Sequence, residues 1–81
     1  MNTVSLDVHT ERTQMCVSSP DGVVLLEKIV PTTREELRRE LGSIPGPKRV
    51  VFENGHLAAL IIDAASGVAE EIIACDPTAT N

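Results

Sequence analysis

Two acidic residues stand where a carboxylate could hold a metal ion. Asp7 lies inside the apolar segment 4–8, and Glu53 follows the apolar run 50–52. A carboxylate inside an apolar strand costs free energy unless it is paired, hydrogen-bonded or bound to metal. Two facing carboxylates favour a divalent cation, and Mg²⁺ prefers oxygen ligands together with water and phosphate. We therefore predict Asp7 and Glu53 as catalytic residues and metal ligands. The alternative is an outward-facing polar residue and an ordinary strand end.

Other reactive side chains show no spacing typical of a site. The histidines His9 and His56 and the cysteines Cys16 and Cys75 form no C-x-x-C or H-x-x-x-H pair, which argues against zinc. We expect both cysteines to be reduced packing residues. The arginines at positions 34, 38 and 39 could contact phosphate, but the neighbouring glutamates favour a neutralised, solvated surface.

Five segments have the composition of strands. Residues 3–9 and 12–18 alternate apolar and polar side chains, and a Ser-Pro-Asp-Gly turn at 19–22 leads into the apolar run 23–30, which together predict an antiparallel meander. Residues 49–52 form a short apolar run without alternation, of the kind buried on both faces of a parallel sheet. Residues 71–75 are the last expected strand.

Two segments between the later strands are typical of helices. Thr32 with Glu35, or Thr33 with Glu36, forms a capping box, and the helix that follows should run to about Leu41 and stop at Gly42. Its thin apolar face consists of Leu37 and Leu41, and Glu35 and Arg39 have the favourable i,i+4 order. A second helix is predicted where four apolar residues have helical spacing, Leu57, Leu60, Ile61 and Ala64.

The predicted order β-β-β-α-β-α-β indicates one α/β domain over residues 1–81 with a mixed five-stranded sheet. In a meander followed by crossovers, the first and fourth strands are parallel neighbours, which would bring Asp7 and Glu53 together. Right-handed crossovers place both helices on one face. The other face would expose aliphatic side chains, so we predict a homodimer, or a further C-terminal segment, that covers it.

Charge and composition restrict the partners. The net charge is −5, from 12 acidic and 7 basic residues, so the surface as a whole repels phosphate. Any nucleic-acid binding must therefore be local or assisted by metal. No apolar stretch reaches the ~18 residues of a membrane span, and no signal peptide is evident. We expect a cytoplasmic protein that does not bind membranes.

Four stretches resemble one family in order along nearly the whole chain. They are Val-Ser-Leu-Asp-Val-His at 4–9, the Pro-Asp-Gly turn at 20–22, the run 30–37, and Val-Val-Phe-Glu-Asn-Gly at 50–55. Together they resemble the N-terminal RuvC-like, RNase H-like domain of DEDD transposases of the insertion-sequence "one-ten" group.

The resemblance implies metal-dependent cleavage and joining of DNA strands, with Asp7 and Glu53 matching the first two of four acidic Mg²⁺ ligands. The family's other two aspartates lie in a Lys-Thr-Asp-x-x-Asp-Ala-like stretch that this sequence lacks, and Asp76 does not match either of them. We therefore expect an incomplete domain with a weak metal site and little activity alone. DNA, and in some members a guide RNA, would be partners of the full-length enzyme.

Two other interpretations stay open. One is a non-catalytic dimerisation or interaction module derived from a transposase. The other is a nucleotide-binding half of the actin-like or sugar-kinase class, whose phosphate loop requires glycine beside the strand aspartate. Residues 8–10 contain no glycine.

Overall fold

A computed structural model describes residues 1–76 of the chain. Within this range the chain forms five strands and two helices, in the order β1 (Asn2–Val8), β2 (Arg12–Ser18), β3 (Val24–Pro31), α1 (Arg34–Ser43), β4 (Lys48–Glu53), α2 (Ala58–Ala65) and β5 (Glu71–Cys75). The bounds of β2 and β5 are those predicted, and the other strands shift by one residue at one or both ends.

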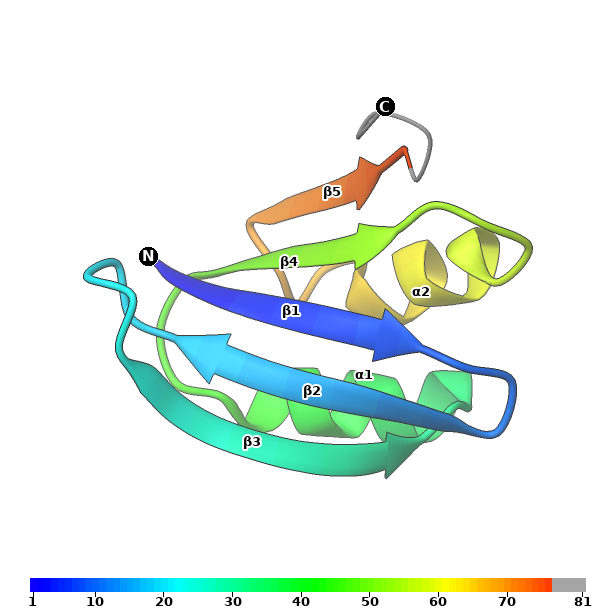
Figure 1. The fold of residues 1–81 in the computed structure, drawn as a ribbon, viewed down its shortest axis with the longest axis horizontal. Coiled ribbons are helices and arrows are strands. Elements are labelled where there is room, and N and C mark those ends of the chain that lie inside the picture. Colours follow the sequence, from blue (N-terminus) through cyan, green and yellow to red (C-terminus); the bar gives the residue numbers. More distant parts are fainter. Residues whose placement is uncertain (77–81) are drawn as a thin grey trace.

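The strands form one mixed sheet in the order β3-β2-β1-β4-β5 (Figure 1). The first three strands pair antiparallel as a meander, whereas β4 runs parallel to both β1 and β5. The prediction of an α/β fold with a mixed five-stranded sheet is confirmed. Because β1 and β4 are parallel neighbours, their carboxyl ends lie side by side.

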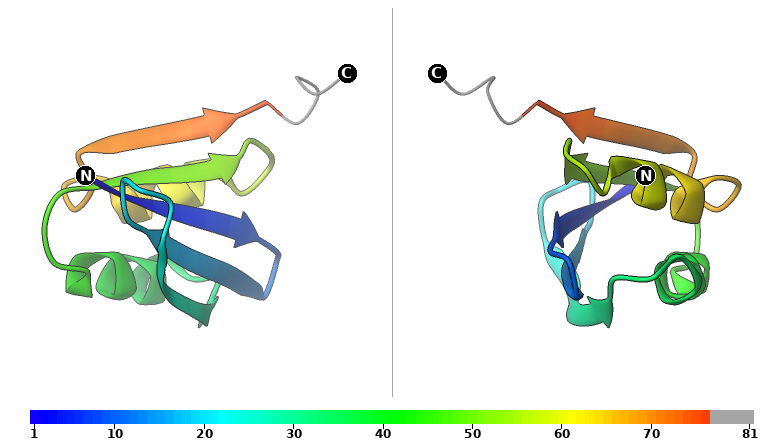
Figure 2. Two further views of the ribbon diagram at one scale, coloured as in Figure 1. Left: turned by 60° about the vertical axis from the view of Figure 1, so that its left-hand side comes forward. Right: turned by 90° about the vertical axis from the view of Figure 1, so that its right-hand side faces the viewer.

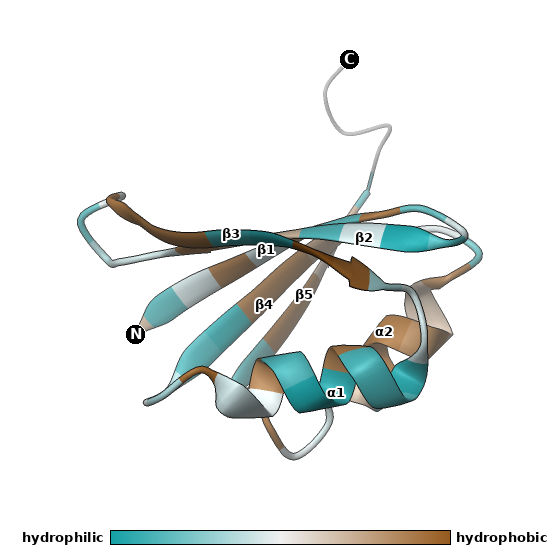
Figure 3. Ribbon diagram, turned by 90° about the horizontal axis from the view of Figure 1, so that it is seen from below, coloured by the Kyte–Doolittle hydropathy of each residue, from teal (hydrophilic) through white to brown (hydrophobic). Residues whose placement is uncertain are grey.

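Alternating side chains of the strands build the core against the helices. Both helices lie on the same side of the sheet in Figure 3, and the views of Figure 2 agree. Val4, Leu6 and Phe52 are at most 5% exposed and pack with Leu37 of α1 and Ile61 of α2 in one cluster. Burial of each large aliphatic or aromatic side chain contributes about 1.5–3 kcal/mol, so this single cluster holds the two layers together.

Thr33 begins α1, since its hydroxyl accepts a hydrogen bond from the Glu36 amide at 3.2 Å. Leu37 and Leu41 are fully buried, as the thin apolar face predicts. The predicted stop at Gly42 is wrong, because α1 continues to Ser43 and Gly42 has no positive φ. No helix among residues 1–76 is long and apolar enough to cross a membrane.

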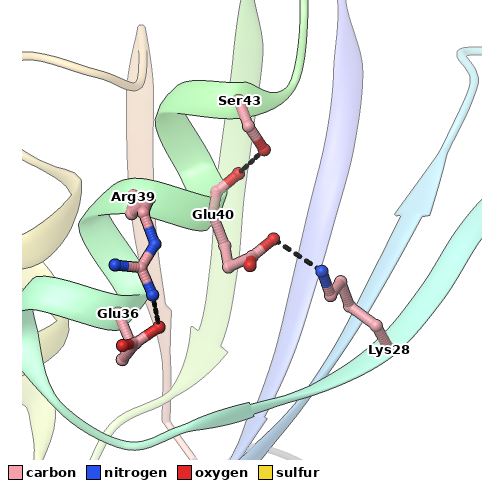
Figure 4. Close-up of polar contacts among 5 residues, drawn as sticks. All are labelled: Lys28, Glu36, Arg39, Glu40 and Ser43. Carbon is pink, nitrogen blue, oxygen red and sulfur yellow. Dashed lines mark hydrogen bonds and ion pairs between the residues drawn. The ribbon is translucent and has the colours of Figure 1, made fainter.

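Charged side chains of α1 form ion pairs within the helix and with β3. Arg39 bonds to Glu36 rather than to the predicted Glu35, and Lys28 of β3 reaches Glu40 at 2.9 Å (Figure 4).

Two other arginines of α1 bind α2. Arg34 pairs with Asp63, and Arg38 donates to the carbonyl of Ser66 at 2.7 Å. The prediction that neighbouring glutamates neutralise these arginines holds for Arg39, whereas Arg34 and Arg38 bind groups in and just after α2 and so join the two helices.

The helix-free face of the sheet is only partly apolar. Strand β4 alternates in burial, and Val51 is half-buried, so the prediction that this strand is buried on both faces is wrong. Cys16 is half-buried but Cys75 is exposed, and both are free thiols, so Cys75 is not the packing residue predicted. Large aliphatic side chains are also exposed along β3 and just before it, namely Val23, Val24, Leu25, Leu26 and Ile29. Not all of them face the helix-free side, because Leu26 lies opposite Val17, whose side chain is buried in the core.

Candidate metal site at the carboxyl edge of the sheet

Parallel pairing of β1 with β4 brings the two predicted ligands to one edge. The register runs through Leu6 opposite Phe52, and Asp7 and Glu53 are the next residues on their strands. Because Leu6 and Phe52 point into the core, both acidic side chains point to the helix-free side. The prediction that the first and fourth strands are parallel neighbours is confirmed.

Both carboxylates line one hollow at this edge. Its volume is about 260 Å³, and its wall combines the ends of β1 and β4 with the turn that leads into α2: Asp7, Val8, Glu53, Asn54, Gly55, His56 and Leu57. In Figure 1 the arrowheads of β1 and β4 end on the side where this turn passes. The two acidic residues therefore share a concave, polar surface, which a ligand needs.

The carboxylates are hydrated rather than buried. The Asp7 side chain is 71% exposed, and its one polar partner in the described part of the chain is His9, with Nε2 3.3 Å from Oδ1. Glu53 is also exposed, and within residues 1–76 its carboxylate has no hydrogen bond or ion pair. The argument that an apolar strand imposes a desolvation cost on Asp7 is therefore wrong, because the side chain leaves the strand on its solvated face.

Backbone hydrogen bonds fix the turn beside Glu53. The Asn54 amide donates to the carbonyl of Cys75 at 2.7 Å, and the Ala58 amide donates to that of Gly55 at 3.0 Å. No side chain caps α2, whereas Thr33 caps α1. The first amide of α2, that of Ala58, is thus held by a backbone carbonyl of the turn and not by a side-chain cap.

Two polar wall residues of the hollow were not predicted as site residues. Asn54 and His56 both line it. The signal that identifies them is proximity in sequence, because they follow directly after the strand that ends at Glu53. An amide and an imidazole add hydrogen-bond donors to a wall whose charged groups are both acidic.

The donor set suits a hard divalent cation with incomplete protein ligation. Mg²⁺ is commonly bound by one or two carboxylates, with waters and substrate phosphates in its other positions. Among the residues that the structure describes, no group of three or more His, Cys, Asp or Glu side chains could hold a metal. Two carboxylates are within the number that such a partial site uses, and Mg²⁺ binding by Asp7 and Glu53 stays a prediction.

No known protein family matches this chain, and no curated protein is significantly similar to it.

Proposed function

We propose that this chain is an RNase H-like domain from the N-terminal part of a metal-dependent DNA strand-transfer enzyme of the transposase type. The observation that carries the proposal is the parallel β1–β4 pairing, which sets Asp7 and Glu53 side by side over a shared hollow. The element order and the helices on one side of the sheet support the RNase H-like assignment.

Asp7 and Glu53 would hold Mg²⁺ from two neighbouring strands. Bound there, the ion would activate an attacking oxygen and stabilise the leaving oxygen of a phosphodiester. The chain's own contribution is placement: two neighbouring strands carry the carboxylates to one hollow, which leaves room for a phosphate group. With two carboxylates in place of four, we expect weak metal binding and little cleavage by this chain alone.

The test is a Mg²⁺ titration followed by ¹H–¹⁵N NMR. Adding Mg²⁺ should shift the amide signals of Asp7 and of residues 53–57, and Asp7→Asn should abolish the shifts around Glu53. Glu71→Gln is the matched control, because it also removes one carboxylate, but from the opposite edge of the sheet. If Asp7→Asn leaves the Mg²⁺ shifts at Glu53 unchanged, the proposed metal site is wrong.

A specific observation also favours the second candidate, a dimerisation module. Five aliphatic side chains at and just before β3 are 43–61% exposed, and β3 is an edge strand with a free backbone side. Such edges pair readily with another chain. The proposed partner is a second copy, and Ile29→Glu should weaken the dimer in size-exclusion chromatography with light scattering. A wild-type chain that stays monomeric over a wide concentration range would contradict this candidate.

A further inference from the structure

The basic side chains of this protein are almost all engaged internally. Of the 7 Lys and Arg residues, six donate hydrogen bonds to carboxylates or backbone carbonyls within residues 1–76. These donors and their acceptors are Lys28 to Glu40, Arg34 to Asp63, Arg38 to Ala64 and Ser66, Arg39 to Glu36, Lys48 to Val68, and Arg49 to Glu71. Arg12 is the one basic side chain in this range that has no such partner.

Arg12 lies at the same edge and on the same face as the candidate metal site. It is exposed and begins β2 directly before Thr13, which is fully buried on the helix side, so Arg12 points to the helix-free side. The His9 amide donates to the Arg12 carbonyl at 3.1 Å, which continues the β1–β2 register beyond Val8. Asp7 is therefore two residues along the neighbouring strand, on the same face.

We propose that Arg12 contacts a phosphate of the DNA strand that enters the Asp7–Glu53 site, and so acts as a positioning residue. The inference rests on the proposed function, because it takes DNA as the ligand. At a net charge of −5, and with two carboxylates in the hollow, phosphate is repelled unless a cation is at hand. Arg12 supplies a positive charge beside the hollow. The other basic side chains have partners that a phosphate would have to displace.

Arg12 also forms no ion pair with the acidic residues of the β1–β2 hairpin. The adjacent Glu11 is exposed in the turn between β1 and β2, and neither it nor Asp7 is paired with Arg12. A guanidinium that is already hydrated, exposed and unpaired gives up no protein contact when it binds a phosphate. Its planar donors match phosphate oxygens better than an ammonium group does.

The experiment compares two arginines on one face of the sheet. Arg12→Gln and Arg49→Gln each remove one positive charge from the helix-free side, the second at the opposite edge, where Arg49 pairs with Glu71. Binding of a short fluorescein-labelled single-stranded DNA to the full chain is measured by fluorescence anisotropy in Mg²⁺, over a range of salt concentrations. Arg12→Lys tests whether the charge suffices, and NMR spectra verify that each variant is folded.

Arg12→Gln should weaken DNA binding by roughly threefold to tenfold and reduce the salt slope by about 0.7, the value for one phosphate contact on a single strand. Arg12→Lys should retain most of the affinity, and Arg49→Gln should match the wild type. Equal losses for Arg12→Gln and Arg49→Gln, or no DNA binding by the wild type, would overturn the inference. The Mg²⁺ titration separates the two failures. If Mg²⁺ still shifts the signals of Asp7 and Glu53, only the role of Arg12 is wrong. If it does not, the proposed function is wrong as well.

Discussion

Acidic and basic residues lie at both ends of the parallel strands, the amino edge and the carboxyl edge of the sheet, but they are paired differently at the two. At the amino edge, where β4 and β5 begin, Lys48 is 5% exposed and its Nζ donates to the Val68 carbonyl at 3.3 Å. The Lys48 amide donates to Glu70 at 2.9 Å, and Arg49 pairs with Glu71 at 2.7 Å. Each charged side chain of this edge therefore has a partner of the opposite charge or a backbone partner.

The carboxyl edge lacks this pairing. Within residues 1–76 the Asp7 carboxylate pairs only with His9, the Glu53 carboxylate has no partner, and Arg12 lies on the same face without an ion pair. At the amino edge the charged side chains connect the start of β4 with the start of β5 and the residues just before it. At the carboxyl edge they stay hydrated and open to a ligand. We infer that the amino edge serves stability and the carboxyl edge serves binding.

Replacing Lys48 should have the largest effect on stability. Lys48→Ala removes a buried side-chain stem together with a hydrogen bond, so the free energy of unfolding should fall by about 1–3 kcal/mol in urea denaturation. Lys48→Met keeps the stem and should recover more than half of the loss. If both variants lose the same amount, the charge rather than the packing of Lys48 matters at this edge.

Breaking the exposed ion pair of the amino edge should cost less. Glu71→Gln removes the partner of Arg49, whose side chain is 40% exposed, so solvent screening limits the loss to about 0.2–1 kcal/mol. Thermal unfolding at low and high salt measures it, and the difference from wild type should shrink as salt rises. A loss that is independent of salt would show that Glu71 acts through something other than charge.

The two carboxylates of the candidate site should matter least for folding. Asp7→Asn and Glu53→Gln should each change the free energy of unfolding by no more than about 0.5 kcal/mol, because both side chains are exposed and neither has a strong partner. Chemical denaturation of the two variants beside Lys48→Ala gives the comparison. A loss as large as that of Lys48→Ala would mean that the carboxyl edge also serves stability.

Local patterns in the sequence predicted most of the fold and the pairing of β1 with β4. Alternation predicted β1 and β2, and apolar runs predicted β3 and β4. Of the two possible capping boxes, the structure shows the register in which Thr33 caps α1. The end of α1 was missed because Gly42 keeps helical geometry and the helix stops one residue later, after Ser43. The burial of Val51 was predicted wrongly, because the run Val-Val-Phe occurs both in strands covered on one face and in strands covered on both.

Long-range charge contacts could not be predicted from local spacing. Arg34 and Arg38 find their partners in and just after α2, far along the chain, whereas spacing rules compare residues three or four apart. Arg12 is distinctive only because the other basic side chains are engaged, which the fold alone reveals. The placement of Asp7 and Glu53 on neighbouring parallel strands could be predicted because strand order, unlike side-chain pairing, follows from the succession of elements; their role as metal ligands stays a prediction.

The most direct test of the difference between the edges is paramagnetic broadening by Mn²⁺, which replaces Mg²⁺ at carboxylate sites. Substoichiometric Mn²⁺ should broaden the ¹H–¹⁵N signals of Asp7 and of residues 53–56 first. The signals of Lys48, Arg49, Glu70 and Glu71 should stay sharp. Broadening that is uniform, or that begins at the amino edge, would contradict a metal site formed by Asp7 and Glu53.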